Sequence, residues 1–472
     1  MPPTSTSTTT LLPPEAKPPK SKSQPYYSVH PSWQDVVPIA QVDQAGALAA
    51  IAYSPRYSEA MSYLRSVMAD TEVSERALAL TEDLISMNPA HYTVWIYRMR
   101  VLRGMWTGAK AAKVDEADEK QEAGDEAGEI DEALWQNIQR ELKWLDEVSF
   151  RNLKNYQIWH HRHALVDLLP STPDTTAFTA STPSQSTETT TSDRHKKAST
   201  AAPLTEATKT RLLKLVASEQ TFLAQILSLD TKNYHVWSYR QWLCMRFPSF
   251  LLPSYTSETP SSVAGTYRSH PEVAAIDAMI LDDLRNNSAW SHRYFILFGH
   301  HELTYSNIHG VILKNVNEER LLHKAGLVDM PLIEAEIEYT KQEIRKAPMN
   351  GSSWNYLRGL LSHSALDIST TRDFCEEFLG PEKDLWMDQY VDVESEDSET
   401  GEKQTERQQI GVRSSHAVEW LSEIYAAEGT EEGRRRAKEC LRSLGEKWDI
   451  IRMGYWDFLG EKMEEEWKQK DA

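Results

Sequence analysis

Histidine and acidic residues are the side chains of this sequence that could hold a metal ion. His160, His161 and His163 lie close together, but adjacent residues of a helix point to different faces and do not converge on one ion. The run His300-His301-Glu302 lacks the HExxH spacing, which places two histidines one helical turn apart. The sequence therefore predicts no metal site on this chain.

Lys154 is the cation whose position could serve an anionic ligand. It lies just before a predicted helix, and a helix N-terminus carries free amide groups and partial positive charge that suit an anion. An ordinary exposed loop lysine has the same local sequence. The residues around Lys154, taken alone, favour the ordinary loop lysine.

Predicted helices surround Lys154. Residues 74–87 carry apolar side chains at helical spacing, with Ser74 as a plausible N-cap and Asn88-Pro89 as the end of the helix. A second helical pattern follows over 92–102, and similar pairs recur near 134–169, 211–247, 273–299 and 332–363. Period-2 strand patterns are scarce. The sequence thus predicts an all-α chain of antiparallel helix hairpins.

One motif recurs five times in these helices: Asn, three residues, Trp, two residues, Arg. Its members are Trp95, Arg98, Trp159, Arg162, Trp237, Arg240, Trp290, Arg293 and Trp354. The Asn can cap the helix, the Trp can pack against the preceding helix, and the Arg can pair with a carboxylate or carbonyl of the neighbouring repeat. His91 replaces the Asn of the first copy, and Leu357 replaces the Arg of the fifth. These residues are interpreted as structural.

Polar low-complexity segments interrupt the repeats. Residues 171–203 are rich in Thr, Ser and Pro, and the acidic runs 115–132 and 392–407 hold most of the formal net charge of −19. Such segments bury little apolar surface. We predict a disordered tail over 1–28, a single helical-repeat domain over 29–470, and disordered insertions at about 108–130, 171–205 and 392–410.

Composition excludes several classes of function. A pI near 5.3 argues against a nucleic-acid partner, because phosphate backbones select basic surfaces. No run approaches the 18 apolar residues of a membrane span, and Met1–Pro25 lacks the apolar core of a signal peptide. The three cysteines lie far apart in the chain, so neither a CxxC site nor a disulfide framework is expected. A cytoplasmic location is the expectation.

The repeat resembles the prenyltransferase alpha-subunit repeat. From about residue 33 to 460 the chain resembles the alpha subunits shared by protein farnesyltransferase and geranylgeranyltransferase type I. The segments that carry the resemblance are 33–41, 51–54, 74–77, 152–162, 350–357 and 449–456. The Rab geranylgeranyltransferase alpha subunit shares the repeats, but segment 33–41 and Tyr455-Trp456 favour the first family.

The resemblance implies a right-handed superhelical solenoid, a crescent of hairpins wrapped around a separate beta subunit. It also implies zinc on that beta subunit and magnesium with the diphosphate. The heterodimer would transfer a farnesyl or geranylgeranyl group from its diphosphate to the cysteine of a C-terminal CaaX sequence, and this chain alone would be inactive. A non-enzymatic tetratricopeptide-like scaffold is the alternative, although the Gly, Ala and Pro signatures of such repeats are absent.

The resemblance also assigns roles to individual residues. The lysine that matches Lys154 approaches the isoprenoid diphosphate and assists its departure. Tyr156 and Gln157 match positions that face the substrate, and the Gln amide is implicated in holding the CaaX carboxylate. Three residues match positions near the active-site rim, although helix capping and packing against the beta subunit explain them equally well: Asn233, Tyr234 and His235.

Overall fold

The computed structural model describes most of the chain. The described residues are 27–41, 51–107, 129–172, 204–253, 267–299, 330–387, 390–396, 403–409 and 411–471. The predicted tail 1–28 and the predicted insertions 108–130 and 171–205 lie almost entirely outside these residues, and the run 300–302 lies wholly outside them.

The chain folds as two compact units. The first holds the residues up to Leu169, and the second holds those from Pro170 onward together with Ala127–Glu129. The sequence predicted one helical-repeat domain over 29–470. The boundary between the two units coincides with the start of the Ser/Thr-rich insertion predicted at 171–205.

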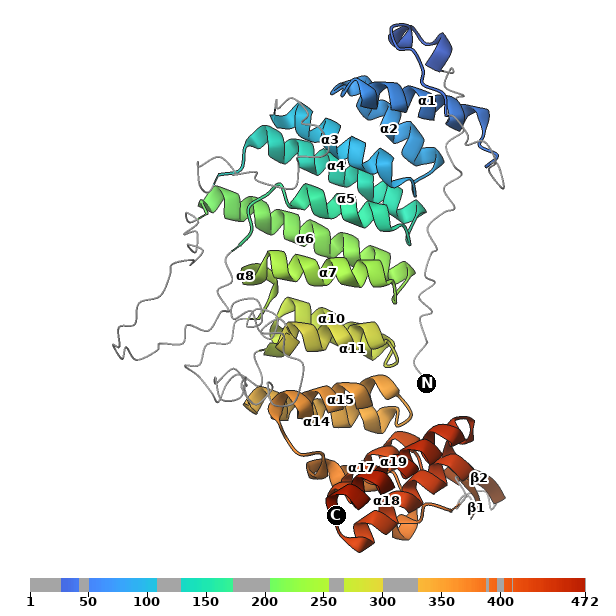
Figure 1. The fold of residues 1–472 in the computed structure, drawn as a ribbon. Helices are drawn as coiled ribbons and strands as arrows, with labels where there is room; N and C mark the ends of the chain where they lie inside the picture. Colours follow the sequence, from blue (N-terminus) through green and yellow to red (C-terminus); the bar gives the residue numbers. More distant parts are fainter. Residues whose placement is uncertain are drawn as a thin grey trace, which may run out of the picture. The chain divides into compact units, whose positions relative to one another are not determined.

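Helix hairpins make up the first unit (Figure 1). Its elements are η1 (Tyr27–Val29), η2 (Pro31–Trp33), α1 (Pro55–Ala69), α2 (Glu75–Met87), α3 (Tyr92–Thr107), α4 (Glu132–Arg151) and α5 (Tyr156–Val166). Helix α2 packs on α3, and α4 packs on α5. Helix α3 also contacts α5, so the second helices of consecutive hairpins are neighbours.

The second unit continues the same architecture. Its hairpins are α6 (Glu206–Leu229) with α7 (Tyr234–Arg246), α10 (Pro271–Asp282) with α11 (Asn287–Tyr294), α14 (Met330–Lys346) with α15 (Gly351–Ser364), and α17 (Ser415–Ala427) with α18 (Glu431–Ser443). The remaining helical elements are α8 (Pro248–Leu251), η4 (Tyr267–Ser269), the π-helical η5 (Phe295–Gly299), η6 (Ile368–Thr371), α16 (Arg372–Glu376), η7 (Pro381–Lys383), the π-helical η8 (Leu444–Trp448), η9 (Ile450–Arg452) and α19 (Met453–Asp471). The prediction of an all-α fold of antiparallel hairpins is confirmed for the repeats.

A β-hairpin is the exception to the helical fold. Strands β1 (Tyr390–Glu396) and β2 (Lys403–Gln409) pair antiparallel, from Tyr390 opposite Gln409 to Glu396 opposite Lys403. The prediction of a disordered insertion at 392–410 is therefore wrong for the described part of that segment. Two seven-residue stretches can satisfy their backbone groups against each other without a large apolar face, and composition alone does not reveal such pairing.

The Asn of each motif caps its helix. Asn155, Asn233, Asn286 and Asn350 each accept a hydrogen bond on Oδ1 from the backbone N–H two residues later, at 2.9 to 3.2 Å. This contact satisfies one of the amide groups that a helix start leaves without an intrahelical partner. The caps fix the residue at which each second helix begins.

The indole of the motif Trp closes the turn before its own helix. Nε1 of Trp237 donates to the carbonyl of Thr231 at 2.9 Å, and Trp95, Trp290 and Trp354 make the same bond to the carbonyl six residues earlier. The Thr231 carbonyl also accepts from Nδ2 of Asn286 at 3.2 Å. One carbonyl thereby joins the Trp of one repeat to the cap of the next.

A buried glutamate binds consecutive repeats together. Arg98 on α3 reaches both carboxylate oxygens of Glu141 on α4, at 2.6 and 2.8 Å. The same bidentate contact links Arg240 to Glu272 and Arg293 to Glu336 in the second unit. These contacts place Arg98, Arg240 and Arg293 between repeats, and the motif Trp side chains are buried.

The fifth repeat keeps a variant of this contact. Although Leu357 occupies the motif position of Arg, the next residue, Arg358, reaches both carboxylate oxygens of Glu423 on α17 at 2.8 Å. This pair is more than a third exposed, unlike the buried pairs before it. In the second repeat, Arg162 donates to Asp146 of its own hairpin at 2.7 Å.

Candidate functional site

A surface depression at the junction of α4 and α5 brings together three residues predicted from the sequence. Lys154, Tyr156 and Gln157 line this depression, which has a volume of about 600 Å³. Ala90, before α3, and residues 150–153, at the end of α4, complete its wall. The sequence thus identified adjacent residues that do share one surface feature.

The local sequence explains why Lys154 lies at this edge. Helix α4 ends at Arg151, and the side-chain amide of Asn152 donates to the Val148 carbonyl at 3.0 Å. The backbone N–H of Asn155 donates to the Asn152 carbonyl at 3.0 Å, which closes a tight turn. Asn155 then caps α5. Lys154 is exposed in the turn directly before the positive end of that helix.

The depression combines positive charge with aromatic surface. Its charged lining residues are Arg151 and Lys154, and none of its lining residues is acidic. The rings of Phe150 and Tyr156 are 40% and 60% exposed beside them. This arrangement suits a ligand that joins an anionic group to an apolar one.

A buried charge network holds α5 in place behind the depression. Glu141 accepts from Arg98 and also contacts Nε2 of His161 on α5 at 3.0 Å. Burial would raise the pKa of Glu141, but the hydrogen bond from His161 and the charge of Arg98 outweigh it and lower that pKa to about 2. Burial, opposed only in part by Glu141, lowers the pKa of His161. Both lowered pKa values are consistent with an ionised Glu141 that accepts a hydrogen bond from Nε2–H of a neutral His161.

The sequence analysis missed these glutamates, although their spacing was a signal. Glu141, Glu219, Glu272 and Glu336 each lie 18 residues before a motif Trp. The residue two after that Trp binds the same carboxylate, as His161, Tyr239, His292 and Tyr356 respectively. The first repeat, which follows no other, has Ala77 at this position. The glutamate pairs with an Arg of the preceding repeat, so the first repeat does not need one.

The other predicted substrate residues begin α7 in the second unit. Asn233 is buried and caps the helix, with the N–H of His235 at 3.1 Å from its Oδ1. His235 is also buried, whereas Tyr234 is 67% exposed. The rings of Tyr234 and His235 lie 3.8 Å apart between centroids. Asn233 therefore has a structural role here, and Tyr234 presents the accessible surface.

The described residues offer one cluster with metal-ligand chemistry, and it does not fit a catalytic zinc ion. Candidate ligand atoms of Cys244, Glu272 and His292 lie within 4.8 Å of one another, and all three residues are buried. Glu272, however, already accepts from Arg240 and contacts His292 at 2.9 Å. A catalytic zinc ion needs an open coordination position. The cluster repeats the glutamate network of the other hairpins.

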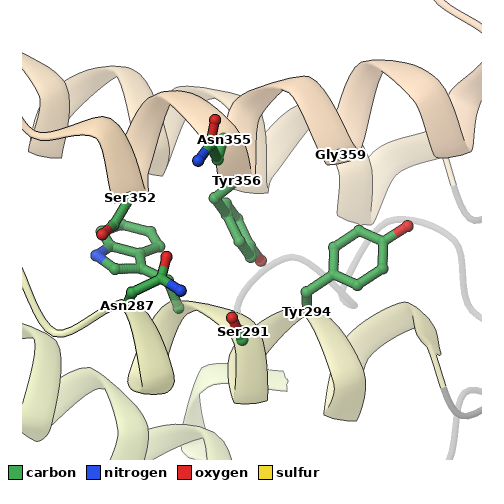
Figure 2. Close-up of a pocket in the computed structure, with 8 residues that line it drawn as sticks. Asn287, Ser291, Tyr294, Ser352, Asn355, Tyr356 and Gly359 are labelled. Carbon is green, nitrogen blue, oxygen red and sulfur yellow. The ribbon is translucent and has the colours of Figure 1, made fainter. Parts of the chain in front are cut away.

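A second depression, of about 290 Å³, lies between α11 and α15 (Figure 2). Asn287 and Ser291 line it from α11, and Asn355 lines it from α15. Tyr294 crosses one end beside Gly359, where an added Cβ would come within 3.2 Å of the Tyr294 ring. Its lining carries no formal charge, so it does not match a diphosphate.

No helix among the described residues is long and apolar enough to cross a membrane.

Paired helices, joined through a Trp and a buried Arg–Glu contact, define a helical-repeat protein. The protein prenyltransferase alpha subunit repeat matches residues 74–105, 138–169, 216–247, 270–299 and 333–364. These five segments include the five motif Trp residues. The chain belongs to the protein prenyltransferase alpha subunit repeat family.

Two curated relatives match along most of the chain, and a third matches a shorter part of it. The farnesyltransferase/geranylgeranyltransferase type-1 subunit alpha of Candida albicans is 28% identical over 91% of this chain and 97% of its own length. The Dictyostelium discoideum subunit of the same name is 26% identical over 92% of each chain. The Schizosaccharomyces pombe subunit is 38% identical, over 28% of this chain and 35% of its own length.

A solved structure has the same fold. The structure described as Candida albicans protein geranylgeranyltransferase-I complexed with GGPP matches 91% of this chain and 98% of its own, with a TM-score of 0.56 and 24% identity. The mouse geranylgeranyl transferase type-2 subunit alpha is 22% identical over only 62% of this chain. The match therefore favours the type-1 subunits over the type-2 subunit.

Proposed function

We propose that this chain is the alpha subunit of a heterodimeric CaaX protein prenyltransferase. The observation that carries the proposal is the match to type-1 alpha subunits over 91% and 92% of the chain. With a beta subunit, it transfers a farnesyl or geranylgeranyl group from the isoprenoid diphosphate to the thiol of a C-terminal CaaX cysteine. The type-2 alternative has a shorter match, and a tetratricopeptide-like scaffold does not explain the family match.

Lys154 is proposed to act on the diphosphate. In the reaction the cysteine thiol loses its proton to solvent, and its sulfur forms a bond to the allylic carbon. The carbon–oxygen bond breaks, and the diphosphate leaves with the bonding electrons. A fixed cation beside the departing oxygens stabilises the charge that develops on them. Lys154 is exposed at the edge of the depression, where a ligand can reach its ammonium group.

Tyr156 and Gln157 are proposed to face the protein substrate. The Gln157 amide can donate to the C-terminal carboxylate of a CaaX peptide, and the exposed Tyr156 ring offers apolar contact. Asn233, Tyr234 and His235 are proposed to form part of the active-site rim, with Tyr234 as the accessible residue. From the family resemblance, we expect zinc on the beta subunit and magnesium with the diphosphate. A cytoplasmic location stays a prediction.

Co-expression with candidate beta subunits tests the proposal. The purified heterodimer should transfer a labelled isoprenoid group to a CaaX peptide, whereas this chain alone should not. If no beta subunit yields transfer, the proposed function is wrong.

A single-turnover assay tests Lys154 separately. Lys154→Gln should preserve the heterodimer but slow transfer about 100- to 1,000-fold, as expected when a donor to a developing oxyanion is lost. Lys143→Gln is the matched control, because Lys143 is an exposed lysine on α4 outside the lining of the depression. Equal transfer rates for Lys154→Gln and the wild type would remove Lys154 from the mechanism.

A further inference from the structure

We infer that Arg151 is a second diphosphate-binding residue, which holds the leaving group together with Lys154; this inference rests on the proposed function. Arg151 is the last residue of α4, and its side chain is exposed and lines the same depression as Lys154. The family resemblance assigned it no role. Its position follows from the place at which α4 ends.

The ion pairing of Arg151 differs from that of Arg98 and Arg162 in the first unit. The guanidinium of Arg98 is neutralised by Glu141, and that of Arg162 by Asp146. Among the described residues of the chain, none forms an ion pair with Arg151. Its charge is therefore available to a ligand.

The chemistry of the depression favours a diphosphate over a single carboxylate. Arg151 and Lys154 supply two positive charges, and no lining residue is acidic. A guanidinium can donate two parallel hydrogen bonds to phosphate oxygens, whereas an ammonium group acts as a point charge. The pair can thus engage both phosphates of one ligand. The exposed Phe150 side chain gives the adjoining prenyl chain an apolar surface.

A structural role is the competing explanation for Arg151. A basic residue in the last turn of a helix interacts favourably with the helix dipole, and Arg151 occupies that turn of α4. Such a role would affect stability but would not distinguish a diphosphate from a monophosphate. Ligand affinity therefore separates the two roles more directly than activity does.

Equilibrium binding to the intact heterodimer tests the inference. Geranylgeranyl diphosphate and geranylgeranyl monophosphate are titrated against the wild type, Arg151→Gln, Arg151→Lys and the control Arg140→Gln. Arg140 is an exposed arginine on the same helix that donates to Asn137. Loss of a hydrogen-bonded charge should weaken diphosphate binding by Arg151→Gln about tenfold or more. Arg151→Lys, which keeps the charge but not the fork, should weaken it about threefold.

The other measurements identify which idea fails. In Arg151→Gln, monophosphate binding and the KM for the CaaX peptide should change less than about twofold, since neither depends on the second phosphate contact. In Arg140→Gln, diphosphate binding should also change less than about twofold. Unchanged diphosphate binding in Arg151→Gln would overturn the role of Arg151 and leave the proposed function intact. A raised peptide KM with unchanged diphosphate affinity would assign Arg151 to the CaaX carboxylate instead. A wild-type heterodimer that binds no isoprenoid diphosphate would reject the proposed function itself.

Discussion

Glu336 accepts four hydrogen bonds in the glutamate network, so its charge should contribute strongly to local stability. The carboxylate accepts from Nε and Nη2 of Arg293, both at 2.7 Å, and from the hydroxyls of Tyr267 and Tyr356, both at 2.6 Å. Burial would raise the pKa of Glu336, but the charge of Arg293 and these hydrogen bonds lower it. The carboxylate is therefore ionised at neutral pH.

Glu336→Gln keeps the volume of the side chain and removes its charge. Arg293 is fully buried and would keep only Asp277 as an acidic partner. One of the donors now pointing at the carboxylate would meet an NH2 group, which cannot accept. Breaking a buried pair in this way costs about 3–5 kcal/mol. By contrast, Arg345 and Glu377 are 44% and 40% exposed, and an exposed pair contributes only about 0.2–1 kcal/mol.

Native-state hydrogen exchange on the heterodimer measures this difference where it should arise. Glu336→Gln should reduce the protection of peptides from α11, α14 and α15 about 100-fold or more, since about 1.4 kcal/mol corresponds to a factor of ten. The control Glu377→Gln should reduce it less than about fivefold. Equal, small effects of the two variants would refute the reasoning that buried carboxylates join the repeats.

Three further predictions concern the same repeats. Burial lowers the pKa of His292 below its ordinary 6.5, so the unfolded chain binds the proton first and stability should fall as the pH drops below about 6.5. Tyr fills this position in other repeats. His292→Tyr should therefore lose less stability than the wild type between about pH 7 and pH 5, as measured by thermal unfolding. Asn286→Ala removes a cap and a bond to the Thr231 carbonyl and should cost about 1–2 kcal/mol in urea unfolding. Arg358→Leu, at a part-exposed pair, should cost less than about 1 kcal/mol in the same assay.

The sequence predicted the local parts of the repeat and missed the partners that lie far along the chain. The caps and the Trp positions follow from one short motif, because each acts within six residues. The Arg–Glu separation is 43 residues for Arg98 but 32 for Arg240, since the connections between repeats differ in length. Only the spacing from Glu to the following Trp is constant, because it spans a single hairpin.

The candidate site shows the same division. Lys154, Tyr156 and Gln157 were predictable together because they are adjacent in the chain. Arg151 became a candidate only from the structure, which shows that α4 ends at this residue and that the following turn brings Lys154 to the same depression. Neither feature is fixed by residue type, since an exposed arginine at a helix end is common and its ligand lies outside the chain.

The buried network also explains how one repeat can serve different purposes. Caps, Trp and Glu fix where each second helix begins, so the exposed residue at its start is free to vary without a packing cost. That residue is Tyr92, Tyr156 and Tyr234 in the first three repeats, each at least 60% exposed, but Asn287 and Gly351 in the last two. Because the buried contacts recur while the helix starts differ between repeats, those starts are where ligand contacts can differ. Lys154 and Arg151 lie beside one of them, where a substitution can change ligand contact while the repeat remains folded.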